Sequence, residues 1–77
     1  MDVLSELPPA INQGVDFSPT IQALNTSIAQ LAADNGYLVV DYFTPMVGHP
    51  EYFTDGVHPN ATGYAVMEKA LAAVVRQ

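Results

Sequence analysis

Asp55 and His58 are the two residues of this sequence whose types and spacing best suit chemistry. They lie in the stretch TDGVHPNATGY, where glycine, proline and asparagine would already suffice to reverse the chain. A carboxylate three residues before an imidazole can accept a hydrogen bond from one ring nitrogen. That bond would set the tautomer and leave the other nitrogen free as a base. The stretch is therefore either an acid-base pair or an ordinary turn with a solvated histidine.

The neighbours of this pair favour a fixed geometry. Gly56 can adopt backbone angles that are forbidden to other residues, so the chain can fold tightly between the two side chains. Pro59 biases His58 towards extended conformations. Asn60 is expected to be the N-cap of the helix that follows. These neighbours would hold the imidazole in one direction relative to the carboxylate.

The N-terminal half of the chain predicts a strand, a loop and a helix. Residues 3–7 form a short apolar stretch that two prolines end, and the segment after them is expected to be a loop up to residue 17. Ser18 is expected to be an N-cap and Pro19 the first helical residue, so the helix covers residues 19–35. Its apolar stripe consists of Ile21, Leu24, Ile28 and Leu31.

The C-terminal half predicts a second strand and a second helix. Gly36 suits the left-handed C-cap of the first helix, and a strand is expected at residues 37–41. The unbroken apolar run YLVV is typical of a strand that is covered on both faces. A long loop leads to a helix at residues 60–75. The apolar positions of that helix are Tyr64, Met67, Leu71 and either Val74 or Val75.

The order of elements is therefore β-α-β-α, with two parallel strands joined by a right-handed crossover. Two strands are fewer than the three or more that an independently stable sheet usually needs. We therefore expect the chain to be the C-terminal portion of a larger α/β domain. In such sheets ligands bind beyond the carboxyl ends of the strands, which is where the loop with Asp55 and His58 leaves.

The composition of the chain excludes several classes of protein. Its 77 residues are enough for one domain at most, and 49% hydrophobic against 13% charged residues excludes a disordered chain. A net charge of −6 would repel nucleic acid. The longest apolar run, residues 70–75, is too short to span a membrane, and the first residues do not resemble a signal peptide. The absence of cysteine excludes a thiol nucleophile but leaves the compartment open.

The stretch DGVHPNATGY, followed by Met67, resembles the last sequence block of the SGNH hydrolases, also called GDSL-type esterases or lipases. Upstream, LPPA is similar to the end of a preceding strand of that family. IQALNTSIAQLAADNGYLVVD is similar to the family's penultimate helix and the strand after it, and YFTPM is similar to the loop between that strand and the last block. The resemblance covers practically the whole chain. It implies that residues 1–77 are the C-terminal βαβα part of a flavodoxin-like three-layer domain with a parallel sheet.

The resemblance also implies roles for the pair. His58 would be the general base and Asp55 its orienting partner in a Ser-His-Asp triad. The family's Gly-Asp-Ser nucleophile block and its oxyanion Gly and Asn do not occur here, and Ser18 and Ser27 are explained as a cap and a helix-surface residue. The expected function is hydrolysis of small acyl esters, with O-acetylated carbohydrate as one candidate. The chain would be inactive alone, and its partners would be the substrate and the missing N-terminal part, in the same or a companion chain.

Other residues, and other classes of protein, are also compatible with parts of the sequence. His49 also precedes a proline, but no acid lies at a similar spacing, so it is expected to be solvated or to face substrate. Asp41 is expected to bond the backbone of the next loop, with a position behind His58 as the alternative. Asp41, Glu51, Asp55 and His58 could together bind a divalent metal, but their spacing fits no metal motif, and neither metal nor cofactor is expected. The last alternative is a small acidic binding or carrier module.

Overall fold

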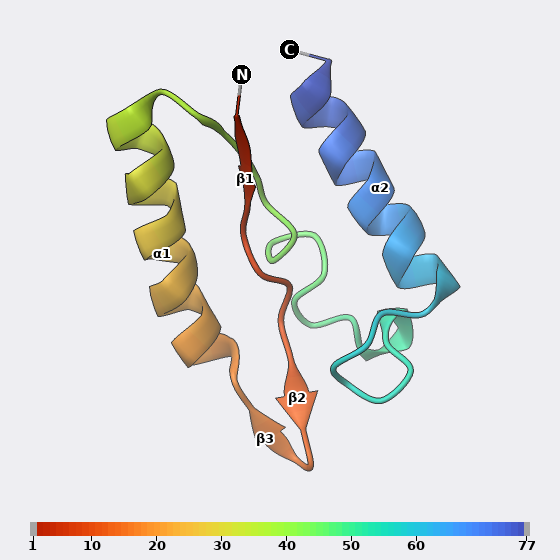
Figure 1. Cartoon of the computed structure of the whole chain (residues 1–77). Coiled ribbons are helices and arrows are strands. Elements are labelled where there is room, and N and C mark those ends of the chain that lie inside the picture. Colours follow the sequence, from red (N-terminus) through yellow and green to blue (C-terminus); the bar gives the residue numbers. More distant parts are fainter. Residues whose placement is uncertain (1, 77) are drawn as a thin grey trace.

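The computed structural model describes residues 2–76 and contains the expected β-α-β-α order (Figure 1). Its principal elements are β1 (Val3–Ser5), α1 (Ser18–Asn35), β4 (Leu38–Val40) and α2 (Ala61–Val75). β1 and β4 pair in parallel, with Leu4 opposite Val39. The predicted parallel βαβα unit is thus confirmed, with both strands shorter than expected. This mixed architecture also differs from an all-helical carrier bundle.

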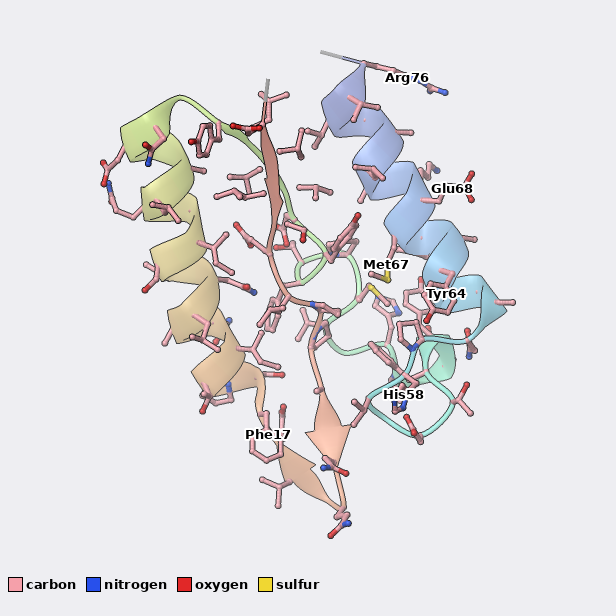
Figure 2. The ribbon with its side chains drawn as sticks, viewed as in Figure 1. Phe17, His58, Tyr64, Met67, Glu68 and Arg76 are labelled. Atoms are coloured by element: carbon pink, nitrogen blue, oxygen red, sulfur yellow. The ribbon has the colours of Figure 1, made fainter. Side chains whose placement is uncertain are left out.

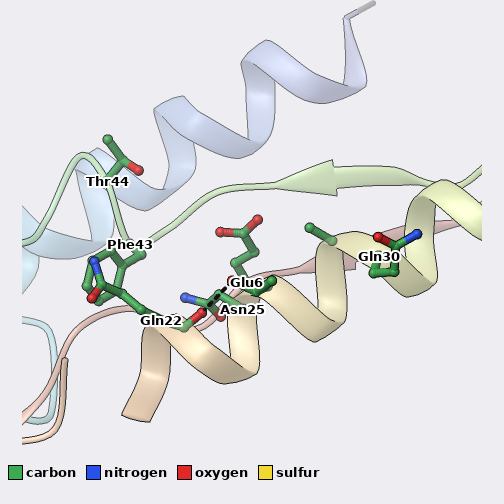
Figure 3. A pocket seen from close by; sticks show the side chains of 8 residues that line it. Glu6, Gln22, Asn25, Gln30, Phe43 and Thr44 are labelled. Atoms are coloured by element: carbon green, nitrogen blue, oxygen red, sulfur yellow. Dashed lines mark hydrogen bonds between the residues drawn. The ribbon is translucent and has the colours of Figure 1, made fainter. Parts of the chain in front are cut away.

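The helices cover opposite sides of the strand pair. α1 packs against both β1 and β4, whereas α2 packs against β4. Figures 1 and 3 both show the strands lying between the two helices. The arrangement is a three-layer α/β architecture, as the resemblance implied. Within residues 2–76, no helix is both long enough and apolar enough to cross a membrane.

The core gathers around β4 and the segment that follows it. Val40 and Met46 are almost completely buried, and Phe43, Ile21 and Ala32 complete the apolar core. Burying side chains of this size is the main favourable contribution to folding, at about 25 cal/mol per Å² of apolar surface. The chain therefore turns back towards the core immediately after leaving the sheet, and this return fixes the base of the long loop.

Asn25 is a buried polar side chain in the middle of α1. Its Nδ2 donates to the carbonyl of Leu7 at 3.0 Å, and its Oδ1 accepts the N–H of Leu7 at 2.7 Å. The amide thus satisfies both backbone groups of a residue beyond the end of β1, as a neighbouring strand would. Because buried polar groups are costly when they are unpaired, this contact fixes α1 against the segment that follows β1.

The apolar stripe predicted for α1 is only partly buried. Ile21 is buried and Ile28 is half-buried, but Leu24 and Leu31 remain 50% and 54% exposed. The inward face instead contains Asn25 and Ala32. A pair of strands is too narrow to cover the whole stripe, so its flank faces away from the core.

The apolar stripe predicted for α2 is also only partly buried. Figure 2 shows Met67 pointing from α2 towards the middle of the molecule and Glu68 pointing away. Gly63 is buried, whereas Tyr64 and Val75 are 58% and 59% exposed and Leu71 is 39% exposed. Within the described residues, Tyr64 and Leu71 are therefore apolar positions of α2 that the core does not cover.

The segment predicted as a loop before α1 contains a hairpin. β2 (Ile11–Asn12) pairs antiparallel with β3 (Val15–Asp16). The two residues between them, Gln13 and Gly14, both have positive φ, at 51° and 79°. Positive φ at both central positions is the requirement of a type I′ turn, which matches the twist of the two strands.

The start of α1 also corrects the sequence prediction. Ser18 is the first residue of the helix and Phe17 the N-cap, so the predicted capping role of Ser18 is wrong. The N–H of Ser18 instead donates to Asp16 Oδ1 at 2.8 Å. Pro19 is therefore the second helical residue and not, as predicted, the first, but it still lies in the first turn, where its missing N–H is not needed. At the other end, Gly36 has φ 69° and is the left-handed C-cap, as predicted.

Candidate active site

The loop after β4 begins with Asp41, whose carboxylate organises the first residues of the loop. Asp41 Oδ1 accepts the N–H groups of Phe43 at 2.8 Å and Thr44 at 3.0 Å. Burial acts to raise the pKa of Asp41, but the hydrogen bonds from Thr44 and Phe43 outweigh it and leave the pKa lowered. The prediction that Asp41 bonds the next loop is confirmed. Among residues 2–76 none of its hydrogen bonds reaches His58.

Glu6 follows β1 and lies beside Asp41 at the carboxyl end of the strand pair. Its backbone N–H donates to the carbonyl of Val40 at 2.9 Å, which extends the parallel pairing by one residue. Burial raises the pKa of the Glu6 carboxyl, and the neighbouring charge of Asp41 raises it further. Two carboxyl groups therefore lie where ligands bind in α/β sheets, a feature that the sequence analysis missed.

Asp55 and His58 form a hydrogen-bonded pair in the turn before α2, where Figure 2 labels His58. Asp55 Oδ2 lies 2.7 Å from His58 Nδ1, and both side chains are exposed. The other carboxylate oxygen accepts the N–H of His58 at 2.7 Å and the N–H of Val57 at 3.0 Å. The predicted pair is thus brought together.

These three contacts determine the charge state and the tautomer of the pair. The backbone N–H of His58, then its ring, then the N–H of Val57 hold the pKa of the Asp55 carboxyl well below its usual range. Because an ionised carboxylate can only accept, Nδ1 carries the hydrogen in this contact. The other ring nitrogen, Nε2, has no hydrogen-bond partner within residues 2–76 and is free to accept a proton.

The turn is closed by backbone contacts on both sides. The N–H of Thr54 donates to the carbonyl of His58 at 2.8 Å, and Phe53 and Pro59 form an isolated antiparallel bridge. The turn therefore leaves and re-enters the body of the molecule at one point, with Asp55 and His58 at its exposed end.

Asn60 and Gly63 attach the end of this turn to α2. Asn60 Oδ1 accepts the N–H of Gly63 at 2.9 Å, which confirms its predicted role as N-cap. Its Nδ2 also donates to the carbonyl of Glu51 at 2.8 Å, in the 3₁₀ helix η1 (Pro50–Tyr52). A Cβ at Gly63 would collide with the carbonyl oxygen of Tyr52. The start of α2 therefore packs directly on η1.

His49 forms a second imidazole–carboxylate pair. Its Nδ1 lies 2.7 Å from Glu51 Oε2, and its ring stacks on Tyr52 with a centroid distance of 4.6 Å and an interplanar angle of 13°. The hydrogen bond with His49 lowers the pKa of the Glu51 carboxyl. No acid lies three residues from His49, as the sequence indicated, but the η1 turn brings Glu51, only two positions away, into contact with it, and this pair was not predicted.

The four residues weighed as metal ligands do not assemble. Glu51 pairs with His49, Asp55 pairs with His58, and Asp41 bonds its own loop. Within the described residues, no group of three or more His, Asp and Glu side chains is close enough to hold a metal ion. The contacts that are present are therefore those of two separate pairs.

Two cavities lie near the carboxyl ends of the strands. A groove of about 500 Å³ runs between α1 and the segment after β4 (Figure 3). It is lined by Glu6, Gln22, Asn25, Thr26, Ala29, Gln30, Phe43 and Thr44, without either residue of the Asp55–His58 pair. A smaller cavity of about 250 Å³ touches that turn at Gly56. Its lining is mostly apolar, with Ile11, Met46, Val47 and Phe53, and it also includes His49.

Comparison with known proteins identifies a family for this arrangement. Residues 2–66 match the model of the GDSL-like Lipase/Acylhydrolase family. A protein from Bacteroides fragilis described as an acylhydrolase has a similar crystal structure, with a TM-score of 0.84 and 32% identity over 96% of this chain. A GDSL-like lipase from Bacteroides thetaiotaomicron has a TM-score of 0.82 and 33% identity, also over 96% of this chain. The chain spans 41% and 42% of those two chains. No curated protein sequence matches it.

Proposed function

The chain belongs to the GDSL-like lipase/acylhydrolase family, and on that premise we propose that it supplies the Asp-His half of a Ser-His-Asp triad to a carboxylic-ester hydrolase. His58 is the general base and Asp55 its orienting partner. The observation that supports these roles best is the 2.7 Å contact between Asp55 Oδ2 and His58 Nδ1, with Nε2 left free. In serine hydrolases, too, Nδ1–H of the histidine donates to the aspartate and Nε2 accepts the proton of the serine hydroxyl.

In the proposed reaction, His58 Nε2 accepts the proton of a serine hydroxyl while the serine oxygen attacks the ester carbonyl. The imidazolium then returns that proton to the departing alcohol, which leaves an acyl-enzyme. Water, deprotonated by the same nitrogen, attacks the acyl carbon. The bond to the serine oxygen breaks, the imidazolium returns the proton to that oxygen, and the acid is released. Asp55 stabilises the imidazolium through Nδ1–H and keeps the ring in place.

The serine and the oxyanion donors are proposed to come from outside these 77 residues. The sequence contains no Gly-Asp-Ser block, and Ser18 and Ser27 both belong to α1, where Ser27 donates to the carbonyl of Ala23 at 3.4 Å. Oxyanion stabilisation is usually the largest single catalytic contribution. A base without nucleophile or oxyanion donors is therefore expected to leave the isolated chain inactive.

We further propose that residues 1–77 are the C-terminal part of one α/β domain. The two relatives extend well beyond the part that this chain matches, and the strand pair lacks a third member within residues 2–76. The remaining strands and helices would come from the same or a companion chain. Addition of a strand next to β1 would bring its loops to the same carboxyl edge as His58.

The small cavity beside the turn supports a small acyl group as substrate. Its volume of about 250 Å³ lies below the range of roughly 300–1,000 Å³ that is usual for drug-sized ligands, and its lining is mostly apolar. Such a space suits a short acyl chain better than a long one. An O-acetylated carbohydrate is one candidate, because it presents a two-carbon acyl group on a polar body.

A comparison of the two histidines tests the proposed function. In a protein that contains the serine block, His58→Ala should lower turnover of p-nitrophenyl acetate by roughly 10⁴ to 10⁶, and Asp55→Asn by about 10⁴ or less. His49→Ala is the matched control, because it also removes an imidazole at 2.7 Å from a carboxylate, and its effect should stay within about tenfold. If His49→Ala abolished turnover and His58→Ala did not, the assignment would be wrong.

A further inference from the structure

Gly56, in the exposed turn between Asp55 and His58, touches a distant part of the chain. Its carbonyl oxygen accepts the N–H of Ile11 at 2.8 Å. Its φ is +86°, and a Cβ at this position would collide with the carbonyl oxygen of Ile11. The turn thus needs glycine for two reasons, a left-handed backbone and the close approach of another backbone.

Ile11 belongs to a hairpin that is itself fixed at its base. It pairs with Asp16 across β2 and β3, and the N–H of Phe17 donates to the carbonyl of Ala10 at 2.9 Å. Asp16 also accepts the N–H of Ser18 at 2.8 Å, at the first residue of α1. The hairpin is therefore a hydrogen-bonded connection between the start of α1 and the tip of the turn.

From these contacts we propose that the β2–β3 hairpin is a positioning element for the Asp55–His58 pair, acting through the backbone contact between Ile11 and Gly56. The two backbone donors to Asp55 Oδ1 belong to Val57 and His58, the residues directly after Gly56. A shift of the Gly56 backbone would carry both donors and the imidazole away from the carboxylate. The catalytic consequence rests on the proposed function, whereas the geometry of the turn does not.

The chain offers a matched control for this contact at Gly36, the C-cap of α1, which lies outside both the hairpin and the turn. Gly36 has φ +69°, also in the left-handed region, but a Cβ there would meet nothing within 4 Å. Gly36→Ala and Gly56→Ala therefore introduce a similar left-handed strain for an alanine. Only Gly56→Ala also forces the turn away from the hairpin.

The test measures the titration of the Asp55 carboxyl by ¹³C NMR in the full chain and in both glycine variants. The wild-type chain and Gly36→Ala should titrate well below the ordinary value of 3.8, and Gly56→Ala should move towards that value. Amide exchange of Ile11 should accelerate by about tenfold or more in Gly56→Ala, because its acceptor is displaced. An unchanged Asp55 titration in Gly56→Ala, or an equal change in Gly36→Ala, would overturn the proposal.

A second pair of variants covers the case in which Gly56→Ala does not fold. Ile11→Pro removes the N–H that Gly56 accepts and leaves the glycine intact, whereas Ile11→Val keeps the N–H. Only Ile11→Pro should raise the Asp55 titration midpoint, and equal midpoints in the two variants would contradict the positioning role. None of these measurements requires ester hydrolysis. An inactive enzyme with the expected titrations would therefore count against the proposed function alone.

Discussion

Two histidines in this chain have the same 2.7 Å contact with a carboxylate, but their surroundings differ. Asp55 is held by backbone N–H groups from two other residues, so its orientation is set by the turn itself. Glu51 contacts the ring of His49 through Oε2, and the Glu51 side chain is 60% exposed. His49 is fixed instead by stacking on Tyr52, at the wall of the apolar cavity. These differences are consistent with the proposed proton transfer by His58 and give His49 a different environment, beside the apolar cavity.

The charge of Asp55 leads to a prediction for stability against pH. Its carboxyl pKa is lower in the folded chain than its ordinary value of 3.8, so its contribution to stability is complete above the unfolded pKa. That contribution is lost as the pH falls through the lower folded-state pKa. Asp55→Asn should therefore be less stable than the wild-type chain at about pH 6, and this deficit should shrink towards pH 2.

Urea unfolding at both pH values measures this difference, in a protein that also contains the serine block and the remaining strands, because a free energy of unfolding requires a cooperative transition. Asp34→Asn is a suitable control, because Asp34 is exposed and its carboxylate accepts a hydrogen bond from Gln30 but none from backbone N–H groups among residues 2–76. Its deficit should change less between the two pH values. A deficit of Asp55→Asn that stayed constant or grew towards pH 2 would show that the charged form of Asp55 is not the stabilised form.

At the scale of elements, the start of α2 is determined by contact with η1. Asn60 bonds both Gly63 and the carbonyl of Glu51, and the N–H of Asn60 donates to the carbonyl of Tyr52 at 2.9 Å. Gly63 lies within the helix, where glycine is normally unfavourable. The close approach of the Tyr52 carbonyl explains why a side chain is absent at this position.

Gly63→Ala should therefore destabilise the chain, against the helix propensity scale. Propensity alone would favour alanine by about 1 kcal/mol. The collision with the Tyr52 carbonyl is expected to cost roughly 1–3 kcal/mol, as overpacking usually does, so the net change is a loss. Urea unfolding of a protein that also contains the serine block and the remaining strands measures this loss. Ala73→Gly on the exposed side of α2 is the control, with a loss of about 1 kcal/mol. A Gly63→Ala variant more stable than the wild-type chain would refute the packing argument.

The elements that local signals determine were predictable from sequence. Gly36 and Asn60 are capping residues of ordinary type, and both ends were predicted correctly. The β2–β3 hairpin was missed because Gln13 occupies a left-handed position where asparagine or glycine is usual. Ser18 has the right residue type for a cap, but the helix begins one residue earlier than predicted. Ser18 is therefore helical, and the Asp16 carboxylate accepts its N–H.

The same distinction holds for the site. The Asp55–His58 contact spans three residues in one turn, so spacing and residue type indicated it as one of two alternatives, and the family resemblance favoured it over a solvated histidine. The roles of Gly56 and Gly63 depend on the carbonyls of Ile11 and Tyr52, which no local pattern reveals. The faces of α1 and α2 were predicted only in part, because burial depends on how much sheet is available to cover them.

At the scale of the whole molecule, each layer presents surface that a larger domain would cover. Successive residues of a strand direct their backbone N–H and C=O groups to opposite edges. The backbone groups of Leu4 point towards β4, whereas those of Val3 and Ser5 point towards the open edge of β1. Large apolar side chains are exposed on both helices, namely Leu24, Leu31, Tyr64, Leu71 and Val75. An open strand edge together with exposed apolar side chains is a usual site of association.

This exposed apolar surface should make the isolated chain prone to association. Alone, the chain should bind a hydrophobic dye, self-associate and melt without a sharp transition, because two strands leave their neighbours unpaired. Addition of a segment that carries the serine block and the remaining strands should abolish dye binding and give a cooperative melt. Leu24→Gln with Leu31→Gln is the matched variant, since both side chains lie on the exposed flank of α1. It should reduce dye binding by the isolated chain and weaken association with the added segment, as size-exclusion chromatography would show. A monodisperse 8.3 kDa monomer with a cooperative melt and no dye binding would instead show that these 77 residues are complete as a folding unit.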